Sequence, residues 1–130
     1  MKSSHGFTII ELIIVVVLFA VASTVFFIQK NNVEVAARDE ARKTSINAMY
    51  YSLEEVYFKE HSSYPRTLNT ETLPSVSPDA FKDPAGVKIG ESTSDFRYEP
   101  LDCEQDSCKS YSLRTILENE DDFVKTNRED

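Results

Sequence analysis

The chain has 130 residues, which is enough for one small domain beside a hydrophobic segment and too few for two domains. Its formal net charge of −8 argues against a surface that binds nucleic acid. The excess acid lies in residues 62–130, which hold 15 Asp and Glu against eight Lys and Arg, whereas residues 1–61 are nearly neutral.

Residues 1–6 form a short polar start, and an apolar run of 22 residues from Phe7 to Ile28 follows, with Glu11 as its only charge. As a helix this run is about 33 Å long, enough to cross a bilayer core of about 30 Å. Lys2 before the run predicts a cytoplasmic N-terminus, with everything after Ile28 facing outward.

Three interpretations of this start are open. Ala20-Val21-Ala22 satisfies the small-residue rule for a secretory signal cut before Ser23. The stretch also fits an anchor that stays uncut, or a leader that is cut after Gly6 and leaves the whole span on the mature chain. Glu11 would interrupt the apolar core of a secretory signal, and apolar residues continue beyond Ala22, which argues against the first interpretation.

The helical period continues after the apolar run. No Pro or Gly occurs from Phe7 to His61, so we expect one helix, with residues 7–29 as the membrane-spanning part and 30–61 as an amphipathic part. Two i,i+4 pairs, Asp39–Lys43 and Glu55–Lys59, favour this helix. One stripe at spacings of mainly three and four predicts the face that packs on the head: Val33, Ala37, Ala41, Ser45, Ile46, Met49, Leu53, Val56 and Tyr57.

Residues 62–130 are predicted to form the head. Ser62-Ser63-Tyr64-Pro65 ends the helix, because the residue before a proline is pushed out of the helical region. A loop over 66–86 and short strands at 87–89, 95–99 and 111–117 follow, giving a small antiparallel sheet that the amphipathic part of the helix covers. The fold class is therefore predicted to be α+β. Residues 118–130 are expected to be a loosely ordered acidic tail, with one short docking segment at Phe123-Val124.

Cys103 and Cys108 are the only cysteines of the chain. A head carried across a membrane meets an oxidising compartment, where such a pair normally closes into a disulfide. Two free thiols in a cytosolic protein are the alternative. A zinc site is disfavoured because it needs four ligands, and His5 and His61 are remote in sequence.

The short leader ending in Gly6, followed by Phe7, Thr8, Glu11 and a further apolar run, resembles the processing site of type IV pilins and type II secretion pseudopilins. Shorter patterns in the head are similar to landmarks of the major pseudopilins: Ser63-Tyr64-Pro65, Asp83-Pro84 with Gly86, and Phe96-Arg97-Tyr98. The likeness covers the first 61 residues well and the head more loosely.

The resemblance implies a type IV pilin-like fold and a prepilin peptidase that cuts between Gly6 and Phe7 and methylates the new amino group of Phe7. It implies a single-pass membrane protein that an inner-membrane assembly platform passes into a homo-oligomeric helical filament. That filament would be an extracellular pilus or a periplasm-spanning pseudopilus. The residues do not distinguish a twitching or adhesive type IV pilus, a secretion pseudopilus and a competence pilus.

Two features of the family bear on this sequence. Major pseudopilins often bind calcium in a loop of the sheet, and Glu118, Glu120, Asp121 and Asp122 supply oxygens of the right type, although acid runs are usually a solvated face. No other cofactor is expected. Many pilins carry a helix-breaking Pro or Gly within the apolar segment, and this span has neither, so local melting of the helix is less expected here.

Glu11 has a predicted role that follows from charge alone. Cleavage after Gly6 leaves a positive amine on Phe7, about 6 Å along the axis from Glu11 and constrained by the same helix. The amine of a neighbouring subunit could pair with Glu11 and neutralise two charges that are costly in apolar surroundings. Glu11, Phe7 and Thr8 are therefore expected to set the register of an incoming subunit, in a contact that repeats without closing.

Other functions remain as alternatives. One is a minor pseudopilin, and another is a membrane-anchored or secreted binding domain that does not polymerise. An enzyme is not expected, because the sequence has no nucleophile elbow, Gly-rich phosphate loop, HExxH or CxxC. His61 is interpreted as a helix-end or surface residue. Five aromatic residues are interpreted as packing beneath the sheet: Tyr50, Tyr51, Tyr57, Phe58 and Tyr64.

Overall fold

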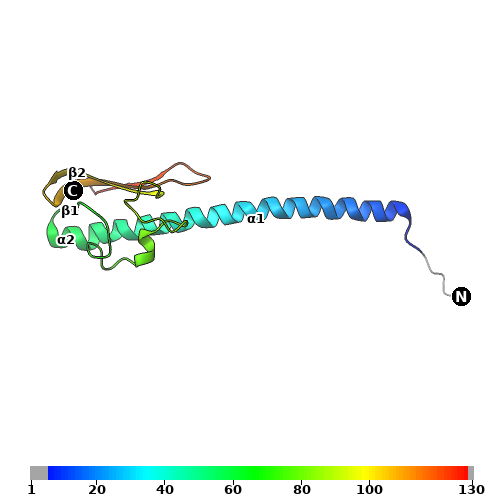
Figure 1. The fold of residues 1–130 in the computed structure, drawn as a ribbon, viewed down its shortest axis with the longest axis horizontal. Coiled ribbons are helices and arrows are strands. Elements are labelled where there is room, and N and C mark those ends of the chain that lie inside the picture. Colours follow the sequence, from blue (N-terminus) through cyan, green and yellow to red (C-terminus); the bar gives the residue numbers. More distant parts are fainter. Residues whose placement is uncertain (1–5, 129–130) are drawn as a thin grey trace. The chain divides into compact units, whose positions relative to one another are not determined.

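The computed structural model describes residues 6–128, so Lys2 and its predicted cytoplasmic position lie outside the described residues. Helix runs from Ile9 to His61 in three consecutive parts: α1 (Ile9–Ser52), the π-helical turn η1 (Leu53–Tyr57) and α2 (Phe58–His61) (Figure 1). The prediction of one long helix that ends before Tyr64-Pro65 is confirmed. The π turn is an addition that the residue spacing did not indicate.

The chain divides into two compact units, Met1–Val35 and Ala36–Asp130. In the first unit, the large apolar side chains from Phe7 to Ile28 are 48–84% exposed. The helix is long and apolar enough to cross a membrane, by length and composition. Exposed side chains of this kind are expected where lipid or another protein provides the cover.

The second unit contains a four-stranded antiparallel sheet with β3 (Ser107–Thr115) at its centre. On one side β3 pairs with β2 (Phe96–Glu104), and the two form a hairpin whose turn places Gln105 at φ +57°. On its other side β3 pairs with β1 (Tyr64–Pro65) near one end and with β4 (Phe123–Thr126) near the other.

The structure extends two of the predicted strands and corrects a third. The strands predicted at 95–99 and 111–117 lie within or overlap β2 and β3. The strand predicted at 87–89 is wrong: only a single bridge, Lys82 to Lys88, forms there. The segment is bounded by Gly86 and Gly90 at φ +85° and +91°, which turn the chain at both ends. The short docking segment predicted at Phe123-Val124 is confirmed, because these residues begin β4 and pair with β3.

The core of the second unit lies between the helix, the sheet and the loop over residues 66–95. Ile46, Met49 and Leu53 are the core side chains that the helix contributes, as predicted from the stripe. The other core side chains are Tyr64, Leu68, Leu73, Val76, Phe81, Phe96, Cys108, Tyr111 and Leu113. The short 3-10 helix η2 (Pro78–Phe81) lies on the other side of the helix from the sheet (Figure 1).

Four of the nine positions of the predicted stripe are wrong. Val33, Ala37, Ala41 and Val56 are exposed, and the positions that continue the buried face toward the N-terminus are Asp39 and Arg42. The spacing of apolar residues assigned two different faces of the helix to one stripe. In the turns from residue 37 to residue 42, the exposed face carries small apolar residues, whereas the buried face carries the ion pair of Asp39 and Arg42. A face of small residues therefore remains uncovered within the second unit.

Candidate functional site

The first turn of α1 is closed by a reciprocal pair of side chains, Thr8 and Glu11. The amide and the hydroxyl of Thr8 both donate to Oε2 of Glu11, each at 3.2 Å. The amide of Glu11 donates in return to the Thr8 hydroxyl at 3.3 Å. This is a capping box, in which two free backbone donors of a helix start are satisfied reciprocally. The carboxylate of Glu11 is thus held by its own chain at the very start of the helix.

Gly6 and Phe7 precede the helix and are exposed, with Phe7 at 84%. A Cβ added to Gly6 would meet no atom within 4 Å, and its φ is not in the left-handed region. The described residues therefore place no steric demand for glycine at this position. The peptide bond between Gly6 and Phe7 lies outside regular secondary structure, between two exposed residues.

The remaining hydroxyls of the span are bonded to their own helix. Ser23 and Thr24 donate to the carbonyls of Phe19 and Ala20, both at 2.8 Å. Such back-bonding lets a hydroxyl lie in lipid without an unsatisfied donor. Glu11 is the one ionisable side chain of the span, and among the ion pairs of residues 6–128 none involves it.

The comparison with protein families matches residues 1–27 to the prokaryotic N-terminal methylation motif. The chain carries a prepilin-type methylation motif. The matched residues contain the Gly6-Phe7 junction, Thr8 and Glu11, and the motif implies processing by a prepilin peptidase. With the long N-terminal helix and the small antiparallel sheet, the chain is pilin-like in its motif and in its α+β fold. No curated protein and no solved structure matches the chain.

Cys103 and Cys108 form a disulfide, as predicted. The two residues face each other across the β2–β3 hairpin, and Cys108 also pairs with Tyr64 of β1. The bond thus fixes the end of the hairpin to which the chain returns after the helix. It links β2 to β3 across the exposed turn of residues 104–107, next to the register pair of Cys108 and Tyr64.

Two of the acidic residues considered as calcium ligands, Glu118 and Glu120, are bonded to cations of the helix. Glu118 accepts from Arg38 at 2.8 and 2.7 Å and from Arg42 at 2.9 Å, and Glu120 accepts from Lys43 at 2.6 Å. Asp122 lies 3.9 Å from Arg114. Within residues 6–128 no group of three or more His, Cys, Asp or Glu side chains is placed to hold a metal ion. Arginine guanidinium groups are therefore the counter-ions of Glu118 and Asp122, and the Lys43 ammonium group is that of Glu120.

Arg42 and Asp39 form a buried ion pair at 2.9 Å that the sequence analysis missed. Arg42 also binds Asp95 at 2.9 Å, and Asp39 accepts from the backbone amides of Glu118 and Asn119. The i,i+4 pair predicted between Asp39 and Lys43 is therefore wrong, whereas Glu55–Lys59 is confirmed at 2.6 Å. The sequence feature that could have predicted this ion pair is the position of Asp39 and Arg42 on the same helical face as Ile46 and Met49.

These contacts shift two carboxyl groups. Burial alone would raise the pKa of Asp39, but the amides of Glu118 and Asn119 and the charge of Arg42 outweigh it and hold the pKa below its ordinary value. Hydrogen bonds from Arg38 and then Arg42 lower the pKa of Glu118 from 4.5 to about 2. Both groups therefore favour the folded state in their ionised form.

A second buried carboxylate, Glu54, lies in the π turn. It accepts hydrogen bonds from the hydroxyls of Tyr111 at 2.7 Å and Tyr64 at 3.3 Å. Burial, and then the bond to Glu54, raises the pKa of Tyr111. Ser52 and Glu54 are both buried because the helix is covered on two sides: Ser52 bonds to Ser75 of the loop, and Glu54 bonds to tyrosines of the sheet.

The predicted packing is confirmed for Tyr64, which is buried in the core, and for Tyr50, Tyr57 and Phe58, which are partly buried against it. It is wrong for Tyr51, which is 54% exposed. His61 lies at the end of α2, exposed, with Nδ1 3.1 Å from the carbonyl of Tyr57 and its ring stacked on the Tyr57 ring. This agrees with the predicted helix-end position.

Proposed function

We propose that the chain is the repeating structural subunit of a type IV pilus-like filament: a type IV pilus, a secretion pseudopilus or a competence pilus. One observation carries the proposal: the methylation motif continues directly into an apolar helix whose side chains are exposed. A processed helix of this kind has a surface that must be covered by lipid first and by other helices afterwards. Packing of helices against one another in apolar surroundings supplies the cohesion.

Glu11 provides the register in this proposal. Cleavage after Gly6 creates a positive amine on Phe7, and methylation retains its charge. In the free subunit the carboxylate of Glu11 accepts two bonds from Thr8. In the filament the amine of a neighbouring subunit reaches this carboxylate, so that two charges in apolar surroundings neutralise each other. Because the two partners come from different positions on the helix, the contact repeats without closing.

The proposed route follows from the order of the parts. The leader of residues 1–6 stays on the cytoplasmic side, the segment 7–29 crosses the inner membrane, and the head faces outward, where the disulfide can form. A prepilin peptidase and an inner-membrane assembly platform are the partners of this stage. Extraction from the membrane then places residues 7–29 in the core of the filament and the heads on its outside.

Mass spectrometry of the mature chain is the first test. The proposal requires loss of residues 1–6 and the mass of one added methyl group on Phe7. A mature chain that begins at Ser23 would contradict the proposal and leave a secreted binding domain. An uncut chain would leave a plain membrane-anchored domain.

The second test is the variant Glu11→Ala. We expect normal cleavage and membrane insertion, and a filament yield lower by roughly tenfold or more, because the neighbour's amine loses its partner in apolar surroundings. The yield is measured by shearing and quantifying filaments. The matched control is Glu34→Ala, which removes an exposed helical glutamate 3.7 Å from Lys30 and should leave the yield unchanged. Normal filaments from Glu11→Ala would refute the register role.

A minor pseudopilin is the second candidate. In the family such subunits often lack the glutamate at this position or carry a larger head, so Glu11 and the small head favour a repeating subunit. Quantifying this chain in purified filaments separates the two roles: a repeating subunit makes up most of the protein mass.

A further inference from the structure

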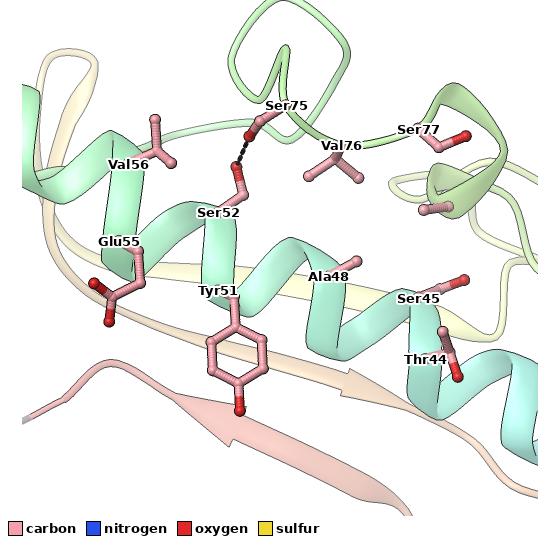
Figure 2. A pocket seen from close by; sticks show the side chains of 11 residues that line it. Thr44, Ser45, Ala48, Tyr51, Ser52, Glu55, Val56, Ser75, Val76 and Ser77 are labelled. Carbon is pink, nitrogen blue, oxygen red and sulfur yellow. Dashed lines mark hydrogen bonds between the residues drawn. The ribbon is translucent and has the colours of Figure 1, made fainter.

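A groove of about 560 Å³ runs along the second unit between α1 and the loop that leads into η2. Figure 2 shows its two walls, with Ser52 of the helix and Ser75 of the loop joined by a hydroxyl–hydroxyl bond of 2.7 Å. Most of its lining side chains are small: Thr44, Ser45, Ala48, Ser75, Ser77 and Ala80. The helical wall belongs to the face of small residues that the core leaves uncovered.

The groove offers an apolar occupant a surface without unpaired charge. Glu55 is the one charged residue in its lining, and its carboxylate already binds Lys59 at 2.6 Å and Arg128 at 2.5 Å. Filling the groove with an apolar side chain would therefore not isolate a buried charge. Small residues on both walls leave room for bulky side chains rather than for another small face.

The outer face of the sheet carries side chains that fit this description. Ile116 and Val124 are 46% and 49% exposed. Val124 is the register partner of Arg114, so Ile116 lies two residues further along on the same face, a diagonal neighbour at roughly 7–8 Å. Their strand neighbours Thr115 and Phe123 point to the core side. We call this pair the Ile116–Val124 knob.

We propose that the groove of one head receives the Ile116–Val124 knob of the next copy of this chain in the filament. The groove lies on the helix–loop side of the head and the knob on the sheet side, so contact between them joins different surfaces of two copies. A contact of this kind repeats without closing, which a filament requires. Groove against groove would place small side chains against small side chains and leave the space unfilled. The inference rests on the proposed filament function and specifies which head surfaces meet.

Cysteine cross-linking in assembled filaments tests the contact, because both native cysteines are held in the Cys103–Cys108 disulfide. The test variant combines Ala48→Cys in the groove with Val124→Cys in the knob. The matched control combines Ala48→Cys with Leu101→Cys, since Leu101 is 51% exposed on a neighbouring strand. Under mild oxidation we expect a ladder of covalent multimers from the test variant, roughly tenfold more than from the control, because fixed neighbours have a high effective concentration.

A second pair, Ser45→Cys with Ile116→Cys, repeats the test with independent positions in case the first variant fails to assemble. A ladder from either pair supports the contact. Filaments that form without a ladder from either pair would overturn it while leaving the proposed function intact. Covalent dimers without higher multimers, a stronger ladder from the Leu101 control, or a cross-link to a different protein would also overturn it. Absence of filaments from the unmodified chain would refute the proposed function itself.

Discussion

Leu18 and Leu53 belong to the same helical stretch, yet Leu18 is 63% exposed and Leu53 is completely buried. The contrast extends to whole regions. From Phe7 to Ile28 the large apolar side chains have no cover within the described chain, whereas from Ile46 onward the helix contributes to a closed core with the sheet and loop. The first region is an apolar surface that needs lipid or another protein to cover it. The second region has buried its apolar side chains in its own core.

The hydrogen bonds of polar side chains also differ between the two regions: they are local in the apolar span and long-range in the head. In the apolar span, Thr8 donates hydrogen bonds to Glu11, and Ser23 and Thr24 donate to carbonyls of their own helix. Each of these bonds is local in sequence. In the head, Arg42 binds Asp95 and Glu118, which are 53 and 76 residues away. The span therefore keeps its secondary structure without a tertiary fold, whereas the head depends on distant contacts.

The variant Arg42→Ala should lower the free energy of unfolding of the head more than any other substitution considered. It leaves Asp39 buried without its guanidinium, and removing one partner of a buried pair costs about 4 kcal/mol. The measurement is urea unfolding of the full chain in detergent. Arg66→Ala, at an exposed position, is the control and should change the free energy of unfolding by less than about 0.5 kcal/mol. Equal effects from both variants would contradict a central role of the Arg42 pair.

The pair Leu53→Ala and Leu18→Ala measures the contrast between the regions directly. Leu53→Ala opens a cavity in the core and should lower the free energy of head unfolding by about 3 kcal/mol. Leu18→Ala removes the same atoms from an exposed position and should leave that free energy unchanged, while it weakens assembly. A destabilised head in Leu18→Ala would show that the two regions are not energetically separate.

Removal of the disulfide should have an intermediate effect. The double variant Cys103→Ser/Cys108→Ser frees a short loop, and the lost constraint on the unfolded chain amounts to about 2 kcal/mol. The unmodified chain in a reducing agent is the control and should show the same urea midpoint as the variant. If reduction leaves the midpoint of the unmodified chain unchanged, the bond does not stabilise the head.

Acid should produce the smallest and most gradual change. The folded-state pKa of Glu118 is about 2 against an ordinary value of 4.5, so its contribution to stability is complete above pH 4.5 and is lost as the pH falls toward 2. The lowered pKa of Asp39 acts in the same direction. In Glu118→Gln the dependence of the urea midpoint on pH over this range should be shallower. An unchanged profile would show that Arg38 and Arg42 do not act through Glu118.

The long helix, the two main strands and the disulfide could be predicted because each depends on local patterns: the absence of Pro and Gly up to His61, the alternation around Phe96 and Tyr111, and the paired cysteines. The buried face of the helix could not be predicted fully. Asp39 and Arg42 are charged, so hydrophobic periodicity ignores them, and their burial depends on amides and carboxylates far along the chain. The docking of Phe123-Val124 could be predicted from its two apolar residues, but its strand form could not, because that form depends on pairing with β3.

The hydroxyl pair around Glu54 has a practical consequence for all of these measurements. The chain contains six tyrosines and no tryptophan, and every tyrosine lies at Tyr50 or beyond. Tyr64 and Tyr111 are buried with their hydroxyls bonded to a carboxylate, and unfolding transfers both rings to water. Near-ultraviolet absorbance and circular dichroism of tyrosine therefore follow the head alone, even in a micelle where the apolar span stays helical. The tyrosines are therefore an intrinsic spectroscopic probe, and they lie in the region whose unfolding is to be measured.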